Sequence, residues 1–119
     1  MYNYIGAASK RCPIIFGYLG SLTGNARLAP AYQIFNYGAD TPFIQKVKAQ
    51  FLGLLLNIAS GRFSEWDIIG LAHSDYPFTL QQVIEVACQN IITGTNLDFT
   101  MRMLDTLNNG YTAIIIKLA

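Results

Sequence analysis

Residues 42–59 read PFIQKVKAQFLGLLLNIA, and this stretch decides the fold. It predicts one helix, because Asp-Thr-Pro at residues 40–42 supplies a capping side chain and a proline suited to a first helical position, and Ser-Gly at residues 60–61 supplies the stop. The apolar side chains with helical spacing are Ile44, Val47, Phe51, Leu54, Leu55 and Ile58. Phe43, Leu52 and Leu56 fall on other faces of the same helix. A helix that is apolar nearly all round must be buried nearly all round, so we expect it at the centre of the protein.

The composition and length of the whole chain fit one domain, residues 1–119, that carries few charged residues. The chain has 119 residues, 52% of them hydrophobic and only 13% charged, and a net charge of +1. An ordinary domain has about 25% charged residues. This composition excludes an intrinsically disordered chain, a collagen, a coiled coil and a disulfide scaffold.

The clearest local pattern on the C-terminal side is a helix start at residue 80. Thr79 is placed as the N-cap and Gln82 as its capping-box partner, while Phe78 and Val83 have the spacing of a hydrophobic staple. Gly94 has the position of a left-handed C-terminal residue. A shorter helix is predicted for residues 68–73, with Ser-Glu-Trp-Asp at residues 64–67 as its capping sequence.

Three other segments permit more than one structure. Residues 97–107 fit a helix or a strand, and we favour the helix because a hairpin through residues 109–110 places Arg102 opposite Lys117. Residues 13–19 and 31–37 are apolar enough for short strands or single-turn helices. Residues 111–118 are β-branched and predict a strand, paired in our interpretation with residues 13–19. The expected fold is mainly α, a compact bundle of about four helices with a small β element contributed by the termini, with α+β as the fallback.

Residues with catalytic or ligating chemistry are few. His73 is the single histidine, and its neighbours Ser74 and Asp75 cannot form a relayed triad with it because adjacent residues lack the geometry. We expect Cys12 and Cys88 to be reduced, because their spacing fits neither a redox motif nor a zinc site. The basic residues form no stripe that suggests nucleic-acid binding. The sequence therefore predicts no enzyme, no cofactor, no metal site and no nucleic-acid partner.

The sequence also carries expectations about location. Residues 1–4 do not read as a signal peptide, and no apolar run approaches the ~20 residues that span a bilayer. With two thiols expected to be free, we place the protein inside a cell or within a particle and not among secreted proteins.

Two functional hypotheses remain. In the first, the chain is a structural or assembly subunit of a larger complex, such as a virion, a phage particle or an organellar complex, in which other chains form a homo- or hetero-oligomer with it and cover its weakly charged surface. Tyrosine combines large contact area with a polar tip and suits such interfaces. The candidate interface residues are Tyr2, Tyr4, Tyr18, Tyr32, Phe35, Tyr37, Leu52 and Leu56. In the alternative, the chain is a small helical domain that binds an apolar ligand beside residues 42–59, in a cavity lined by Phe51, Leu55, Trp66 and Met101.

Overall fold

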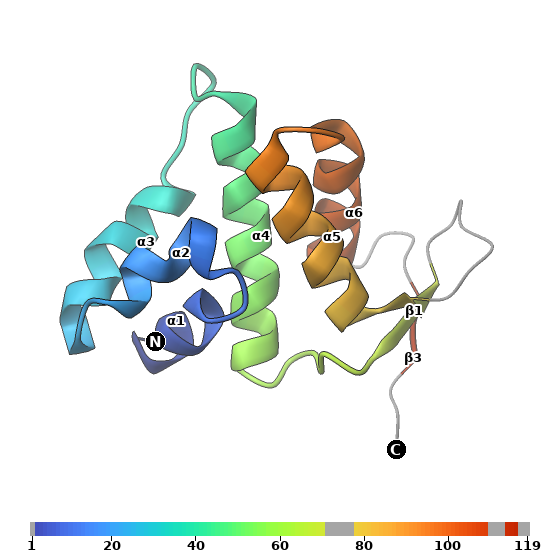
Figure 1. Ribbon diagram of the computed structural model, residues 1–119, viewed down its shortest axis with the longest axis horizontal. Coiled ribbons are helices and arrows are strands. Elements are labelled where there is room, and N and C mark those ends of the chain that lie inside the picture. The colour runs from blue at the N-terminus through green and yellow to red at the C-terminus, as the bar shows by residue number, and fades with distance from the viewer. Residues whose placement is uncertain (1, 71–77, 110–113, 117–119) are drawn as a thin grey trace.

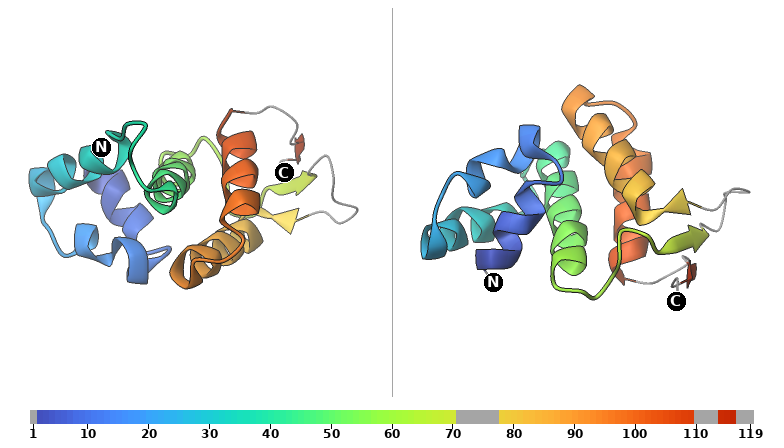
Figure 2. Two further views of the ribbon diagram at one scale, coloured as in Figure 1. Left: turned by 90° about the horizontal axis from the view of Figure 1, so that it is seen from above. Right: turned by 60° about the horizontal axis from the view of Figure 1, so that its bottom comes forward.

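Helix α4 (Phe43–Ala59) runs through the middle of the molecule, between the N-terminal helices and the two C-terminal helices (Figures 1 and 2). The computed structural model describes residues 2–70, 78–109 and 114–116. In these residues the remaining helices are α1 (Tyr2–Ser9), α2 (Pro13–Gly20), the 3₁₀ helix η1 (Gly24–Arg27), α3 (Leu28–Phe35), α5 (Leu80–Thr93) and α6 (Leu97–Asn109). The strands are β1 (Ile68–Gly70), β2 (Phe78–Thr79) and β3 (Ile114–Ile116), which form an antiparallel sheet in the order β2-β1-β3. The chain is therefore mainly helical, as the sequence predicts.

Burial of α4 on several sides explains its central place. α4 contacts α1 and α3 on one flank and α5 and α6 on the other. Its buried side chains are Val47, Ala49, Phe51, Leu52, Leu54, Leu55 and Ile58. All of them except Ala49 belong to one continuous apolar cluster with buried residues of these neighbouring helices, so both flanks share a single core.

The predicted C-terminal end of α4 is confirmed, whereas the predicted N-terminal cap is not. The predicted stop is confirmed, since Ser60 is the C-cap and Gly61 follows with a φ of 85°. The predicted capping side chain is wrong. Pro42 itself occupies the N-cap position, and the hydroxyl of Thr41 accepts a hydrogen bond from the backbone N–H of Gly38 at 3.0 Å. That bond closes the preceding turn instead of capping the helix.

The start of α5 is the capping box that the sequence predicts. The Thr79 hydroxyl accepts from the Gln82 N–H at 3.2 Å, and the Gln82 side-chain oxygen accepts from the Thr79 N–H at 2.9 Å. Gly94 ends the helix with a φ of 69°, a left-handed conformation that glycine adopts without steric cost. The side chain of Phe78 lies outside the described residues, so the staple stays a prediction.

Most of the bundle's finer details differ from expectation. Six α-helices are present in the described residues where about four were predicted. Residues 13–19 lie in α2, which begins with a proline at its first turn, and most of residues 31–37 lie in α3. β3 therefore pairs with β1 in the middle of the chain, and the pairing of the two termini is wrong.

A strand also replaces the short helix expected at residues 68–73. The backbone N–H of Ser64 donates to the Asp67 carboxylate at 2.9 Å, and the Asp67 N–H donates to the Ser64 carbonyl at 3.0 Å. These bonds close an isolated turn, after which Ile68 pairs with Thr79 and Ile116. Residues 71–73 lie outside the described part of the chain. For residues 97–107 the helical interpretation is confirmed by α6.

The expectation of two free thiols is wrong. Cys12 and Cys88 form a disulfide with a Cα–Cα distance of 5.9 Å. The packing of α2 against α5 brings together two cysteines that are 76 residues apart in sequence. Disulfides persist in oxidising surroundings, so the cysteines no longer support placing the protein in a reducing environment.

We predict that the double variant Cys12→Ala/Cys88→Ala is less stable than the wild type by about 4 kcal/mol, because the bridge closes a long loop in the unfolded chain. Urea unfolding of both proteins measures the difference. A reducing agent should lower the wild-type midpoint and leave that of the variant unchanged. Equal midpoints for the oxidised wild type and the variant would refute the bridge.

We predict that Thr79→Ala destabilises the protein by roughly 1 kcal/mol through loss of the N-cap bond. Thr23→Ala is the matched control, because Thr23 occupies the N-cap of η1 without a side-chain hydrogen bond there. Thermal unfolding of the two variants should therefore separate them, and similar losses would contradict the capping account.

Candidate interaction surface

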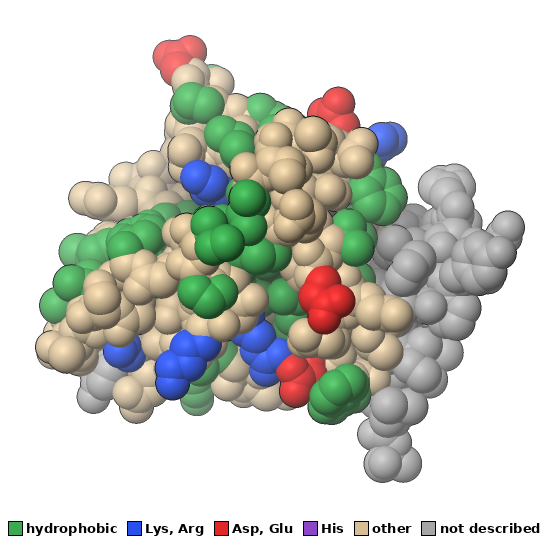
Figure 3. All heavy atoms as spheres, viewed as in Figure 1, with side chains coloured by type: hydrophobic (Ala, Val, Ile, Leu, Met, Phe, Trp, Pro, Cys, Tyr) green, Lys and Arg blue, Asp and Glu red, His purple; other side chains and the backbone are tan. Residues whose placement is uncertain are grey.

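The N-terminal helices expose the aromatic residues that the sequence singles out. α1, α2 and α3 pack together with η1 on one flank of α4 (Figure 2). We define the aromatic platform as the exposed candidates from this flank, whose side chains are 40–57% accessible: Tyr4, Tyr18, Tyr32, Phe35 and Tyr37. Hydrophobic side chains are visible at the surface over α2 and α3 in Figure 3. Partial burial raises the pKa of the Tyr18 hydroxyl, because desolvation disfavours its charged form.

The other three candidate interface residues have different outcomes. Leu52 is wrong as an interface residue, because it is fully buried in the core between the helices. Leu56 is half-buried and packs against the edge of that core. The side chain of Tyr2 lies outside the described residues.

Sequence reasoning missed Ile14, the most exposed large apolar side chain on the platform flank at 80%. Ile14 lies one turn before Tyr18 on α2, so the two residues share a helix face. The sequence of α2, PIIFGYLG, is apolar on every side and has no periodicity that separates an inner face from an outer one. A helical assignment alone would not have found Ile14.

Close backbone packing holds α1 and α2 together beneath the platform. Arg27 donates from Nε to the Leu22 carbonyl at 2.8 Å and from Nη2 to the Gly20 carbonyl at 3.2 Å. A Cβ atom at Gly20 would lie 2.6 Å from the Ser9 hydroxyl, and one at Gly6 would lie 2.2 Å from the Arg27 guanidinium. The two glycines therefore allow α1, α2 and Arg27 to approach one another.

A groove borders the platform where the end of α3 meets α4 and α6. Its volume is about 410 Å³. We call it the amide groove, and its lining residues are Phe35, Tyr37, Ala49, Gln50, Gly53, Leu56, Asn57 and Asn108. Three candidate interface residues thus meet in one groove: Phe35 at the end of α3, Tyr37 just after it, and Leu56 from α4.

Side-chain amides connect α4 and α6 along this groove. Asn108 Nδ2 donates to both the carbonyl and the side-chain oxygen of Gln50, each at 2.9 Å. Asn57 Nδ2 donates to Asn108 Oδ1 at 3.2 Å. Gly53 lies between them on α4, and a Cβ there would be 3.4 Å from Asn108 Nδ2. The glycine leaves room for Asn108 to cross the helix.

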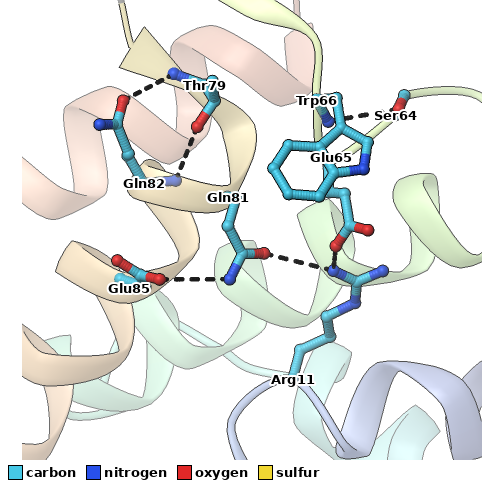
Figure 4. A network of polar contacts seen from close by, with 8 residues as sticks. All are labelled: Arg11, Ser64, Glu65, Trp66, Thr79, Gln81, Gln82 and Glu85. Carbon is cyan, nitrogen blue, oxygen red and sulfur yellow. Dashed lines mark hydrogen bonds and ion pairs between the residues drawn. The ribbon is translucent and has the colours of Figure 1, made fainter.

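A second cleft, of about 400 Å³, is charged and lies beside the disulfide. Arg11 forms an ion pair with Glu65 and donates to Gln81 Oε1 at 3.4 Å, and Gln81 Nε2 donates to Glu85 at 3.3 Å (Figure 4). Lys10 and Cys88 also line this cleft. The network connects the turn between α1 and α2 to residues around the start of α5. These polar side chains therefore bond to one another and stabilise the fold.

The residues proposed for an apolar ligand cavity do not come together around either cleft. Phe51 and Leu55 are fully buried in the core, whereas Trp66 is 58% exposed. Met101 is partly buried and packs against the core. None of the four lines the amide groove or the charged cleft.

The remaining features of the chain concern metal binding, catalysis and membrane crossing. Residues 2–70, 78–109 and 114–116 contain no group of three histidine, cysteine or carboxylate side chains placed to hold a metal ion. His73 and its neighbours Ser74 and Asp75 lie outside those ranges. Among the described helices, none has both the length and the hydropathy that crossing a membrane requires. Comparison of the chain with protein-family models, curated proteins and solved structures found no match.

We predict that Gly20→Ala destabilises the protein by roughly 1–3 kcal/mol, because the added methyl group collides with the Ser9 hydroxyl beneath the platform. Gly17→Ala is the matched control in the same helix, since its Cβ meets only Pro13 at 3.8 Å. Urea unfolding should show that control to be neutral or slightly stabilising. Adding Ser9→Ala to Gly20→Ala should restore most of the loss, and failure of that rescue would place the strain elsewhere.

Proposed function

We propose that this chain is a non-enzymatic structural or assembly subunit that contacts other protein chains through the aromatic platform. The observation that carries the proposal is the exposure of five large aromatic side chains on one flank of α4. Aromatic residues are enriched in protein–protein interfaces because they supply contact area with few rotatable bonds. A virion, a phage particle or an organellar complex is the kind of assembly that would use such a subunit.

Low surface charge supports the same proposal. The chain has 15 charged residues for an accessible surface of 6865 Å². Charged side chains oppose nonspecific association, and extended apolar patches on a monomer usually mark interaction sites. Ile14 adds to this flank an aliphatic side chain that no neighbour in the chain covers.

We predict that the oxidised wild-type chain is oligomeric or poorly soluble when isolated, and that Tyr18→Gln/Tyr32→Gln shifts it toward a soluble monomer. Size-exclusion chromatography with light scattering measures the change. Phe99→Gln is the matched control, because Phe99 is 50% exposed on α6, outside the platform. Both variants should keep the wild-type free energy of unfolding to within about 0.5 kcal/mol.

A wild-type chain that remains a soluble monomer at high concentration, with no dependence on Tyr18 or Tyr32, would overturn the subunit proposal. Stabilisation of that monomer by fatty acids would instead favour the alternative function, an apolar-ligand domain. Phe51, Leu55, Trp66 and Met101 line neither the amide groove nor the charged cleft, which does not favour this alternative.

A further inference from the structure

The amide groove has a lining that combines aromatic side chains with primary amides and contains no charged residue. Phe35 and Tyr37 form an aromatic wall, each about 40% exposed, and Leu56 adds an aliphatic side chain. Its volume of about 410 Å³ lies within the usual range of ligand pockets, roughly 300–1,000 Å³. A neutral lining disfavours phosphates, nucleic acids and charged peptides, because it has no opposite charge to offset the loss of their hydration.

Among the described residues, the amide network leaves the side-chain NH₂ group of Gln50 and the side-chain oxygen of Asn57 without a partner. Asn108 uses its Nδ2 group on Gln50 and its Oδ1 atom on Asn57. Gln50 therefore retains its side-chain NH₂ group, and Asn57 retains its side-chain oxygen, for a ligand. Asn108 holds both side chains in place. They therefore lose little further conformational entropy when a ligand binds.

The positions of Gln50 and Asn57 along α4 match the repeat of an extended polypeptide. Residues 50 and 57 are seven positions apart on α4, which places them on the same face and about 10.5 Å apart along the helix axis. Three residues of an extended strand cover about 10 Å. A peptide lying along α4 would thus offer a carbonyl to Gln50 and an N–H to Asn57, while an apolar side chain enters the space beside Phe35, Tyr37 and Leu56.

We propose that the amide groove binds an extended, uncharged segment of a partner protein, anchored by an aliphatic or aromatic side chain. The inference rests on the proposed subunit function, and it names the chemistry of the partner. The groove also shares Phe35 and Tyr37 with the aromatic platform, so a bound segment would continue directly into the platform contact. A neutral oligosaccharide is the competing ligand, since aromatic rings and amides also suit sugars, but the spacing of Gln50 and Asn57 along α4 favours a peptide.

The test is a selection from random linear peptides displayed on phage, with the disulfide-bonded full chain as bait. Enriched peptides should be uncharged and carry aliphatic or aromatic residues. Synthetic copies with blocked termini should bind the wild type in solution and shift the side-chain amide resonances of Gln50 and Asn57 in NMR spectra. Asn57→Leu, which removes the acceptor, should weaken binding roughly tenfold.

Two further variants guard against a folding defect. Tyr37→Ser removes a ring that is 40% exposed beyond the end of α3, and it should also weaken the peptide without changing the unfolding midpoint. Asn25→Leu, an exposed asparagine of η1, is the control and should bind as the wild type does. Maltotriose is titrated against the same samples as the carbohydrate probe.

Each outcome has one meaning. The proposal is overturned if no peptides are enriched, if the enriched peptides are charged, or if maltotriose alone binds. It is also overturned if Asn57→Leu and Tyr37→Ser bind the peptide as tightly as the wild type does. Conversion of a wild-type oligomer to a monomer by Asn57→Leu would identify a second copy of this chain as the occupant and overturn the assignment to another protein. Tyr18→Gln/Tyr32→Gln should abolish assembly without changing peptide affinity, so the groove and the platform are tested separately. A monomeric wild type that still binds the peptides refutes the platform alone.

Discussion

The need to bury α4 on several sides organises this structure. One neighbouring layer cannot cover a helix that buries Val47, Phe51 and Leu54 on one face and Leu52 on another, so helices gather on both of its flanks. The resulting core is continuous through α4. This arrangement lets a short chain bury a large share of its apolar residues, although in the described part of the chain no helix except α4 exceeds 14 residues.

Two cross-links join the two flanks that α4 separates. The Cys12–Cys88 disulfide connects the start of α2 to α5, and the Arg11–Glu65 ion pair lies immediately beside it. Both act between the α1–α2 turn and the C-terminal half of the chain. The charged cleft is thereby occupied with internal contacts, whereas the amide groove on α4 and α6 keeps hydrogen-bonding groups available.

The distribution of glycine and aromatic residues in the N-terminal third has a common explanation. Gly6 and Gly20 allow α1, α2 and Arg27 to pack with almost no space between them. Helices that approach this closely leave little interior volume for large side chains, so Tyr4, Tyr18 and Tyr32 point partly into solvent. The N-terminal third therefore exposes aromatic side chains at its surface, and the proposed subunit function is based on this exposure.

The sequence alone determined the features that depend on neighbouring residues. The capping box at Thr79 and Gln82, the stop at Gly61 and the central place of α4 were predictable because each follows from local hydrogen bonding or from helical periodicity. Tertiary structure alone decided the pairing of Cys12 with Cys88, the burial of Leu52 and the conversion of residues 68–70 into a strand, because each depends on a partner distant in the sequence. The amide groove belongs to the second group. Phe35, Gln50 and Asn108 carry no shared motif, and only the packing of α4 against α6 and the end of α3 brings them together.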